Sequence, residues 1–480
     1  MRFKKKYILC IAAAVLLSFT GCNNSNPTAT SDESSSTSTT SGSASTANST
    51  TTTTKPTEFN TEESTSAETE KTDSQVVATD LTPSVGLEFE SNGDGTCTIT
   101  GIGVCMDTNI VIPTTSPSGD TVTLIDEYAF MSLDDVDSVT LLNCSYEVDE
   151  RAFVYGEFTK LYIIGSSPVI NESAFSSCED LKLISFENCN IKIDEYAFIS
   201  CGKDADVTFS DCTGYIDKRA FQYGDITNLT INNCELEIDD SAFSSCEDLE
   251  SIVFTDSTLE IGEYAFISCG DSATLEITNC TVTLDERVFQ YSSIENLKIT
   301  GSEVEFGDSA FSTSEDFKSM VFSDSTLEIG EYTFISCGDS TVVEMTNCSV
   351  TMDDRAFQYS AIESLTITGS EAKIGDSAFS SCEDLTTVII DCSSTYIGKY
   401  AFISCEDLTS VAICDNQSSD NNIEISDRAF QYCEELGSVT IGNGSIKIGE
   451  YAFSGCSDDI TISVAGQSYT ADILKNGLSQ

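Results

Sequence analysis

Apolar residues return at a fixed interval along most of this chain, and each return is marked by the dipeptide Ala-Phe or a close variant. Beyond residue 120 these Phe positions lie 22 or 23 residues apart, except for one interval of 28 in which residues 415–422 form a polar insertion. The positions are Phe130, Phe153, Phe175, Phe198, Phe221, Phe243, Phe266, Phe289, Phe311, Phe334, Phe357, Phe379, Phe402, Phe430 and Phe453. A period of this length indicates a solenoid, because each coil can bury its apolar face only against its neighbours.

Within one coil, alternating apolar and polar residues predict a short strand that ends in a bend. Residues 181–189 read L-K-L-I-S-F-E-N-C, which fits the pattern L-x-x-L-x-L-x-x-[N/C], and residues 136–144 and 226–234 fit it as well. Acidic residues then precede the Ala-Phe dipeptide, where a cap and a helix dipole would favour them. Each coil is therefore expected to be a short strand, a bend and a short helix or 3₁₀ turn, in an α/β repeat of about 15 coils.

The sequence has 21 cysteines but no C-x-x-C pair, and most cysteines fall in two registers of the repeat. Nine follow the repeat Phe by three residues (Cys178, Cys201, Cys246, Cys269, Cys337, Cys382, Cys405, Cys433 and Cys456), and eight close the strand motif (Cys144, Cys189, Cys212, Cys234, Cys280, Cys348, Cys392 and Cys414). A buried Cys column acts as a small hydrophobe with a weak donor. Stacked pairs such as Cys178 and Cys201 could instead oxidise, since coils lie about 5 Å apart. The pair Cys97 and Cys105 is a better disulfide candidate.

The repeat resembles the BspA-like leucine-rich repeat family of bacterial surface proteins, whose coils read roughly I-G-x-x-A-F-x-x-C-x-x-L-x-x-I-x-I. Residues 261–269 read I-G-E-Y-A-F-I-S-C, and residues 448–456 are another match. Residues 86–123 are similar to the β-hairpin cap that often opens this family's solenoid. The resemblance covers residues 86–465 and implies a leucine-rich-repeat solenoid with an N-terminal β-hairpin cap, displayed at the cell surface. It implies function only loosely, because members range across adhesion, protein binding and unknown roles.

The N-terminus reads as a bacterial export signal. Residues 1–22 contain a basic start, an apolar run of 11 residues from Tyr7 to Leu17, and the ending S-F-T-G-C. Such a run is too short to span a bilayer. The ending resembles the lipobox of bacterial lipoproteins, which implies lipidation of Cys22 and an anchor on the extracellular side of the membrane. An ordinary secretory signal is the alternative.

Composition divides the chain into five parts. Of the 24 residues from 31 to 54, 18 are Ser or Thr, and such a tract buries too little apolar surface to offset its chain entropy. The expected parts are a lipoprotein signal peptide at 1–22, a disordered Ser/Thr-rich linker at 23–80, an N-terminal β cap at 81–122, repeats at 123–465, and a C-terminal cap or tail at 466–480.

Charge and composition narrow the function classes. The chain has 79 acidic and 22 basic side chains, a net charge of −57, and no His. Without His there is no Ser-His-Asp relay and no H-E-x-x-H zinc site, and the negative charge repels nucleic acid. We therefore expect no enzyme activity, no cofactor and no nucleic-acid partner. Acidic columns could bind Ca²⁺, but the D-x-[DN]-x-[DN]-G loop is absent, so no specific metal site is expected.

The coils cycle through three types, so that equivalent positions such as Phe198, Phe266 and Phe334 lie 68 residues apart. Two residues before the Phe the chain carries Tyr, Arg or Ser, and two residues after it each of the five Arg-bearing coils carries Tyr. Tyr and Arg are enriched at binding hot spots and would recur about every 15 Å along the solenoid. The predicted ligand-binding residues are Tyr128, Arg151, Tyr155, Tyr196, Arg219, Tyr223, Tyr264, Arg287, Tyr291, Tyr332, Arg355, Tyr359, Tyr400, Arg428 and Tyr432. The alternative is that each Arg only relieves repulsion between stacked carboxylates.

These observations favour a non-enzymatic scaffold at the bacterial cell surface that serves adhesion or protein interaction. Its partner would be an extracellular protein or a host matrix ligand, and its only contact with the membrane would be the lipid anchor. The alternative is a cell-wall or glycan-binding structural protein, in which exposed Tyr side chains would stack on sugars.

Overall fold

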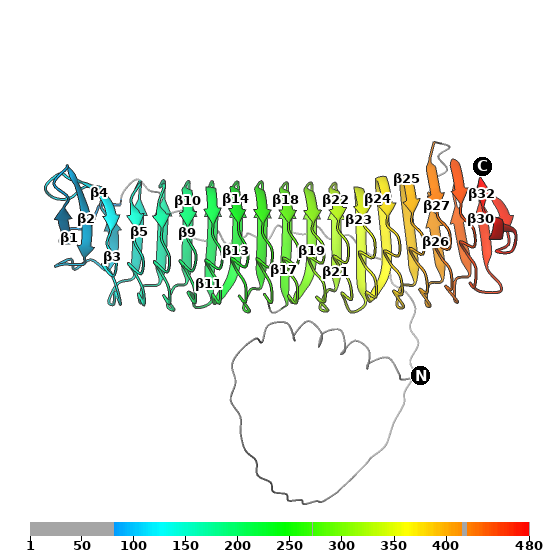
Figure 1. Cartoon of the computed structure of the whole chain (residues 1–480), viewed down its shortest axis with the longest axis horizontal. Helices are drawn as coiled ribbons and strands as arrows, with labels where there is room; N and C mark the ends of the chain where they lie inside the picture. The colour runs from blue at the N-terminus through cyan, green and yellow to red at the C-terminus, as the bar shows by residue number, and fades with distance from the viewer. Residues whose placement is uncertain (1–80, 271, 415–419, 480) are drawn as a thin grey trace, which may run out of the picture. The chain divides into compact units, whose positions relative to one another are not determined.

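The computed structural model describes residues 81–270, 272–414 and 420–479 of the chain. The expected signal peptide at 1–22, the linker at 23–80 and the lipid acceptor Cys22 lie outside the described residues. The described part is a β-solenoid of about 16 turns, in which short strands stack coil upon coil (Figure 1). It contains no helix with the length and hydrophobicity that a membrane crossing requires.

Each coil supplies strands to two parallel ladders, whereas the sequence pattern predicted one strand per coil. The first ladder stacks β3 (Asn109–Ile112), β5 (Ser138–Leu142), β7 (Lys160–Ile164), β9 (Leu183–Glu187), β11 (Ala205–Ser210), β13 (Ile226–Asn232), β15 (Ser251–Thr255), β17 (Ala273–Thr278), β19 (Ile294–Thr300), β21 (Ser319–Ser323), the first parts of β23 (Thr341–Met352), β24 (Ile362–Ile374) and β25 (Thr387–Ile397), then β26 (Ser410–Ile413), β28 (Ser438–Ile441) and β30 (Thr461–Val464).

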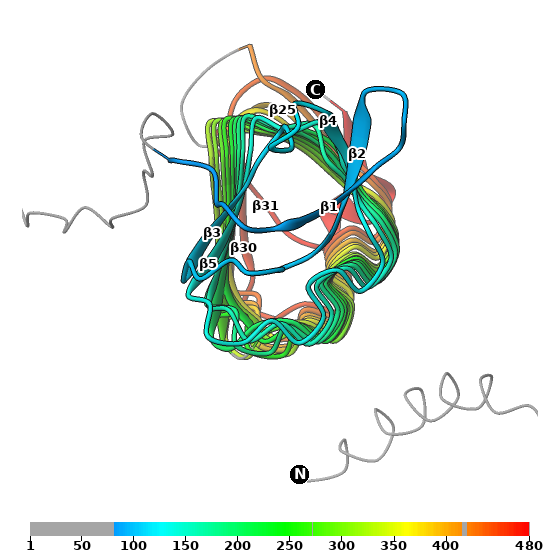
Figure 2. The ribbon, with the colours of Figure 1, turned by 90° about the vertical axis from the view of Figure 1, so that its left-hand side faces the viewer.

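The second ladder follows after a bend. It stacks β2 (Thr96–Gly101), β4 (Thr121–Ile125), β6 (Glu147–Val148), β8 (Val169–Ile170), β10 (Asn190–Ile193), β12 (Thr213–Ile216), β14 (Glu235–Ile238), β16 (Thr258–Ile261), β18 (Thr281–Leu284), β20 (Glu303–Phe306), β22 (Thr326–Ile329), the second parts of β23 to β25, then β27 (Asn422–Ile425) and β29 (Ser445–Ile448). Viewed along the axis, β3 and β5 lie on one side of the coil and β2 and β4 on another (Figure 2).

The two ends of the solenoid differ from its middle. At the N-terminal end, β1 (Glu88–Ser91) pairs antiparallel with β2 as a hairpin. At the C-terminal end, β31 (Gln467–Tyr469) and β32 (Leu478–Ser479) pair antiparallel with the last coil, and the 3₁₀ helix η1 (Ile473–Asn476) lies between them. Antiparallel hairpins and a short helix therefore flank the parallel ladders.

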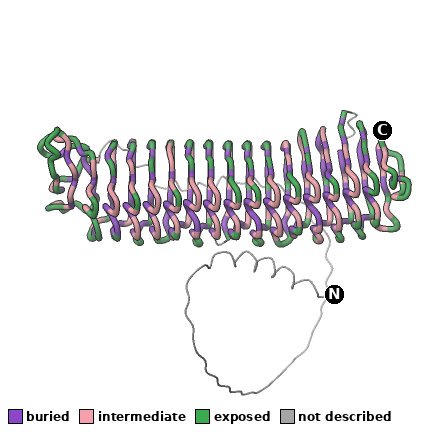
Figure 3. Tube along the Cα trace, viewed as in Figure 1, coloured by how far each residue is buried: buried purple, intermediate pink, exposed green. Residues whose placement is uncertain are grey.

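Equivalent residues of neighbouring coils stack in register. In β15 and β17, for example, Ile252 lies beside Leu275 and Phe254 beside Ile277, and the residues between them face outward. Successive strand residues point to opposite faces, so buried positions align from coil to coil (Figure 3). The alternation in the sequence thus becomes one continuous core.

The repeat Phe residues form the centre of this core. From Phe130 to Phe453, each ring stacks nearly parallel on the next, with centroids 4.7 to 5.5 Å apart. All of these rings are buried, with at most 2% of their surface exposed. The ladder spacing of about 4.8 Å therefore also sets the distance between the aromatic rings.

The prediction of a short helix or 3₁₀ turn in each coil, and with it the α/β class, is wrong. In the described coils the residues around the Phe form consecutive turns, and η1 in the C-terminal tail is the one helical element of the described chain. The Phe198 amide donates to the Ala220 carbonyl of the next coil (2.7 Å), while the Ala197 amide donates to Asp194 within its own coil (3.2 Å). Because the amides of Phe198 and Ser200 bond to the next coil, they are not available for the bonds within the turn that would continue it as a helix.

The first Cys column behaves as a set of weak donors. All nine thiols donate to the carbonyl of a repeat Phe one coil earlier; Cys269, for example, lies 3.0 Å from the Phe243 oxygen. Where this column carries Ser, as at Ser292, the hydroxyl makes the same bond, 2.7 Å to Phe266. Most coils therefore place in this column a small side chain that donates a hydrogen bond, whereas Leu133, Gly156 and Gly224 occupy it without one.

The second Cys column lies at the bend between the two ladders. The thiols of Cys189, Cys212 and Cys280 each donate to a carbonyl two residues earlier, at 3.2 Å. All 19 described cysteines are free thiols, including Cys97 and Cys105, so the candidate disulfide of that pair is not formed. Cys97 instead points its thiol at the Asp120 carbonyl (3.6 Å).

A pair of substitutions tests the role of the first column. Cys269→Ser should change the free energy of unfolding by less than about 1 kcal/mol, because a hydroxyl can make the bond to Phe243 that Ser292 makes to Phe266. Cys269→Ala removes the donor and should cost about 1–2 kcal/mol. Urea unfolding of the full chain measures both values. An Ala variant as stable as the Ser variant would show that only the volume of the side chain matters.

Candidate interaction surface

The segment that leads from the second ladder of one coil to the first ladder of the next carries the predicted ligand-binding residues. We call the surface formed by positions three before to two after each repeat Phe the turn face. The residues two before and two after the Phe adopt left-handed backbone conformations, with φ of 60° at Tyr196, 55° at Arg219 and 58° at Tyr223 and Ser241. This conformation costs most L-residues about 1–2 kcal/mol, and Gly or Asn adopt it most easily.

Residue choice on the turn face is therefore not explained by the backbone. The position two before the Phe is Tyr, Arg or Ser from residue 128 to residue 451, never Gly or Asn. Ser meets the same backbone requirement as Tyr and Arg, with φ of 58° at Ser173 and 59° at Ser377. Tyr and Arg must then be present for what their side chains contact.

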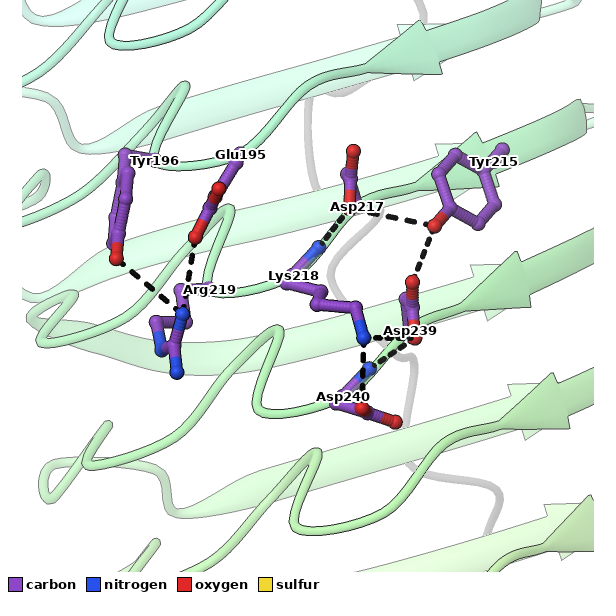
Figure 4. A network of polar contacts seen from close by, with 8 residues as sticks. All are labelled: Glu195, Tyr196, Tyr215, Asp217, Lys218, Arg219, Asp239 and Asp240. Atoms are coloured by element: carbon purple, nitrogen blue, oxygen red, sulfur yellow. Dashed lines mark hydrogen bonds and ion pairs between the residues drawn. The ribbon is translucent and has the colours of Figure 1, made fainter.

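Three arginines form the same cluster with the preceding coil. Arg219 donates from Nη1 to Glu195 Oε1 at 3.0 Å and to Tyr196 Oη at 3.4 Å (Figure 4). We call this arrangement an arginine cluster; it recurs at Arg287 with Glu263 (2.8 Å) and Tyr264 (3.4 Å), and at Arg355 with Glu331 (2.8 Å) and Tyr332 (3.1 Å). Each Arg thus joins an acid and an aromatic ring of the coil before it.

The arginine clusters lie at the surface but are held in place. The three Arg side chains are 37 to 43% exposed, so each ion pair contributes only about 0–1 kcal/mol. The guanidinium carbons of Arg287 and Arg355 lie 5.9 and 5.6 Å from the centroids of the Tyr264 and Tyr332 rings, within the range of a cation–π contact. Tyr332 and Glu331 raise the pKa of Arg355 above its ordinary value, so this side chain stays charged.

Arg151 and Arg428, nearest the two ends of the solenoid, do not form the arginine cluster. Arg151 pairs with Glu150 of its own coil rather than with an acid of the preceding coil. Arg428 donates to Tyr400 Oη (3.3 Å) and lies between two rings, 5.9 Å from Tyr400 and 5.4 Å from Tyr451. Tyr128 is 46% exposed at the start of the series. The cluster geometry is therefore regular only in the middle of the solenoid.

The other predicted tyrosines form a separate column, which we call the tyrosine ladder: Tyr155, Tyr223, Tyr291, Tyr359 and Tyr432. They follow the repeat Phe by two residues and are 46 to 58% exposed. Tyr196, Tyr264, Tyr332 and Tyr400, the tyrosines of the arginine clusters and the Arg428 site, are only partly exposed. The structure therefore divides the predicted set into arginine-bound tyrosines and open ones.

Both sequence-based interpretations of the arginines agree with this geometry. Arg219, Arg287 and Arg355 each face a carboxylate of the neighbouring coil, as relief of charge repulsion requires. They also present part of their guanidinium groups to solvent, as a binding surface requires. Ligand binding by these residues stays a prediction.

A neighbouring polar network was not predicted from the sequence. Tyr215, on the outer side of β12, donates to Asp239 and to Asp217 (3.3 Å), and Lys218 Nζ lies 3.0 Å from Asp240 and 3.9 Å from Asp239 (Figure 4). Burial and the bond to Asp239 raise the pKa of the Tyr215 hydroxyl. One signal was present: the spacing of Tyr215 and Lys218 recurs as Tyr396 and Lys399. Among the described residues, no cluster of three or more acidic or Cys side chains is placed to hold a metal ion.

The chain is similar to known repeat proteins. The model of the BspA type leucine rich repeat region matches residues 105–226, 214–341, 304–423 and 417–472. The chain matches no curated protein.

Several solved structures are similar. A leucine-rich repeat protein from Bacteroides ovatus is 18% identical over 79% of this chain and 93% of its own, with a TM-score of 0.39. A leucine rich cell surface protein from Faecalibacterium prausnitzii is 18% identical over 83% and 98%, with a TM-score of 0.27. A leucine-rich repeat protein from Eubacterium ventriosum is 15% identical over 82% and 98%, with a TM-score of 0.26.

The family match runs from residue 105 to residue 472 and coincides with the stacked coils of the solenoid. The same residues supply the Phe ladder and the first Cys column, which occupy the Phe and Cys positions of the family pattern. This chain therefore belongs to the BspA-type leucine-rich repeat family.

Proposed function

We propose that the chain is a non-enzymatic scaffold that binds an extracellular protein at the bacterial cell surface, held there by a lipid on Cys22. The observation that carries the proposal is the recurrence of one Arg–Tyr–Glu arrangement at Arg219, Arg287 and Arg355, three coils apart. Membership of a leucine-rich repeat family supports a protein-interaction scaffold. The lipobox resemblance of residues 18–22 supports the anchor.

Repetition matters because it multiplies weak contacts. Arg and Tyr are enriched at binding hot spots, and here both are held in place by contacts along the axis. Successive clusters lie about 15 Å apart, three coils at strand spacing. A partner with repeated sites, such as a matrix fibre, could occupy several clusters at once and gain affinity without any new contact.

Charge reversal tests this proposal. The variant Arg219→Glu, Arg287→Glu and Arg355→Glu should lose binding to immobilised host matrix proteins by at least about tenfold, because it replaces three hot-spot cations with repelling charges. Each reversal should cost at most about 1 kcal/mol of stability, since the ion pairs are exposed. Surface plasmon resonance of the full chain measures the binding, and circular dichroism checks the fold.

A matched control separates the clusters from net charge. Lys192→Glu, Lys298→Glu and Lys318→Glu change the charge by the same amount and also break exposed ion pairs, with Asp194, Glu276 and Glu295, but they lie outside the turn face. Binding should survive in this variant. If both variants lose binding equally, overall charge and not the arginine clusters governs capture.

A further inference from the structure

The tyrosine ladder belongs to a longer pattern that the arginine clusters do not explain. The column two residues after the repeat Phe reads Tyr155, Ser177, Ser200, Tyr223, Ser245, Ser268, Tyr291, Thr313, Ser336, Tyr359, Ser381, Ser404 and Tyr432. Each exposed ring is thus separated from the next by two coils with small hydroxyl side chains. We propose that this ladder binds an extended, uncharged polysaccharide, at a site distinct from the arginine clusters.

Packing does not account for the tyrosines. Ser177 and Ser245 occupy the same left-handed conformation (φ 59°) as Tyr155 and Tyr223 (φ 58°), so the fold accepts Ser at this position. Tyr223 and Tyr359 leave 58 and 57% of their surface in water. Their neighbours on the axis are small, so the rings stand above the surface between them. A column of exposed aromatic rings that the core does not need is typical of a binding surface.

The column beside the ladder is uncharged and cycles through Gln, Ser and Ile, as at Gln222, Ser244 and Ile267. The adjacent column, one residue after the repeat Phe, contains Gln222, Gln290 and Gln358, whose amides donate to Ser244, Ser312 and Ser380 of the next coil at 2.9, 2.9 and 3.4 Å. Neither column carries a charged residue from residue 131 to residue 455. In a chain with 79 acidic side chains, two adjoining columns free of charge form a distinct strip. We call these two columns the uncharged strip.

The side chains of the uncharged strip favour an uncharged glycan as the ligand. Aromatic rings stack on the C–H faces of pyranose rings, and hydroxyl and amide groups pair with sugar hydroxyls. A net charge of −57 repels anionic polymers such as uronates and nucleic acids. An uncharged glycan meets no such repulsion, and the strip contains no cation that an anionic glycan would require.

The spacing of the rings in the tyrosine ladder favours a polysaccharide chain in an extended conformation. Tyr155, Tyr223, Tyr291 and Tyr359 are each three coils apart, which is about 15 Å at strand spacing. A linear β-1,4-linked hexose chain rises per sugar by nearly the same length as the solenoid rises per coil. Every third sugar would therefore meet a Tyr ring, and the sugars between would lie over Ser and Thr hydroxyls. A rigid array of this kind gains affinity by multivalency.

The test uses the full chain and substitutions that the fold already accepts. In the ladder variant, Tyr155, Tyr223, Tyr291, Tyr359 and Tyr432 are replaced by Ser, the residue of the intervening coils. The control variant replaces Tyr196, Tyr264, Tyr332 and Tyr400 by Ser and leaves the ladder intact. Pull-down on cellulose, chitin and mannan, with polygalacturonate as the anionic comparison, measures retention. Titration with β-1,4-linked oligosaccharides of two to eight sugars measures the length that binding requires.

We expect the parent chain to bind at least one of the uncharged polysaccharides and not the uronate. The ladder variant should lose about 100-fold or more in affinity, in the range that loss of multivalency gives, while the control variant binds as the parent does. Binding should rise sharply once an oligosaccharide can reach two rings. The single variant Tyr223→Ser should show an intermediate loss and serves if the fivefold variant fails to fold.

Three results would overturn the proposal: no retention of the parent on any uncharged glycan, equal retention of the ladder variant, or loss of protein capture instead of glycan binding in the ladder variant. The proposed protein-binding function fails separately. It depends on Arg219, Arg287 and Arg355, so their reversal should weaken protein capture by at least about tenfold and leave glycan binding unchanged.

Discussion

Raising the pH from 9 to 12 should unfold this solenoid steeply, because a group of its buried thiols resists ionisation in the folded state. Burial raises the pKa of Cys382 from the ordinary value of 9.0 to about 12, and it raises the pKa of Cys201, Cys269 and Cys405 as well. These side chains have no more than 2% of their surface exposed. A thiolate in such a site would lose its hydration without gaining a counter-charge.

The sign of the change in stability with pH follows from the number of protons that the folded and unfolded states bind. Above pH 9 the unfolded chain releases its thiol protons, whereas the folded chain keeps them up to the raised pKa. The folded state then binds more protons, so stability falls as pH rises. Each such thiol lowers the free energy of unfolding by about 1.4 kcal/mol per pH unit between the two pKa values. Below pH 9 the thiols are neutral in both states and add no pH dependence.

Replacing Cys by Ser measures how much the thiols contribute to the pH dependence of the free energy of unfolding. A variant with Ser at 201, 269, 382 and 405 keeps a donor to the Phe carbonyls, as Ser292 does, but removes four titrating groups. Urea unfolding of the full chain at pH 8, 9, 10 and 11 should give a slope that is shallower than that of the parent by about 5 kcal/mol per pH unit. Tyr and Lys titrate equally in both proteins, so they cancel in the comparison. Identical slopes would show that the thiols ionise freely in the folded chain.

The periodic parts of this structure could be predicted because the same residue types recur at the same positions of each repeat. The positions of Phe266 and Cys269 in the repeat predicted a buried apolar face and a buried thiol column, and both are present, the first as a stack of aromatic rings. The second strand was missed although it alternates over four residues in coils such as β16 (Thr258–Ile261). The acidic residues that follow it before the Ala-Phe dipeptide were interpreted as the start of a helical turn.

The turn face was less predictable, and backbone conformation explains why. Left-handed residues are normally signalled by Gly or Asn, but here they are Tyr, Arg and Ser, so a helical turn was expected where none is present. The sequence did single out the Tyr and Arg columns. It could not tell that Arg219 leans toward Tyr196 of the preceding coil while Tyr223 stays open, because both facts depend on how neighbouring coils stack.

Removing one ring from the Phe ladder should show how strongly the coils depend on each other. Phe266 stacks on Phe243 at 5.2 Å and on Phe289 at 4.9 Å, whereas Phe453 at the C-terminal end stacks only on Phe430, at 5.5 Å. Phe266→Ala should cost about 3–5 kcal/mol, the usual loss for a buried Phe. Phe453→Ala should cost about half as much, because it disrupts one interface between coils instead of two.

The m-values of Phe266→Ala and Phe453→Ala also distinguish a solenoid from a globular core. Coils contact only their neighbours, so a cavity at Phe266 weakens the link between the two halves of the solenoid. Urea unfolding of Phe266→Ala should then show a lower m-value, since the halves begin to unfold separately, while Phe453→Ala should keep the m-value of the parent. Equal losses for both variants, with unchanged m-values, would mean that stability is shared over the whole chain and not passed from coil to coil.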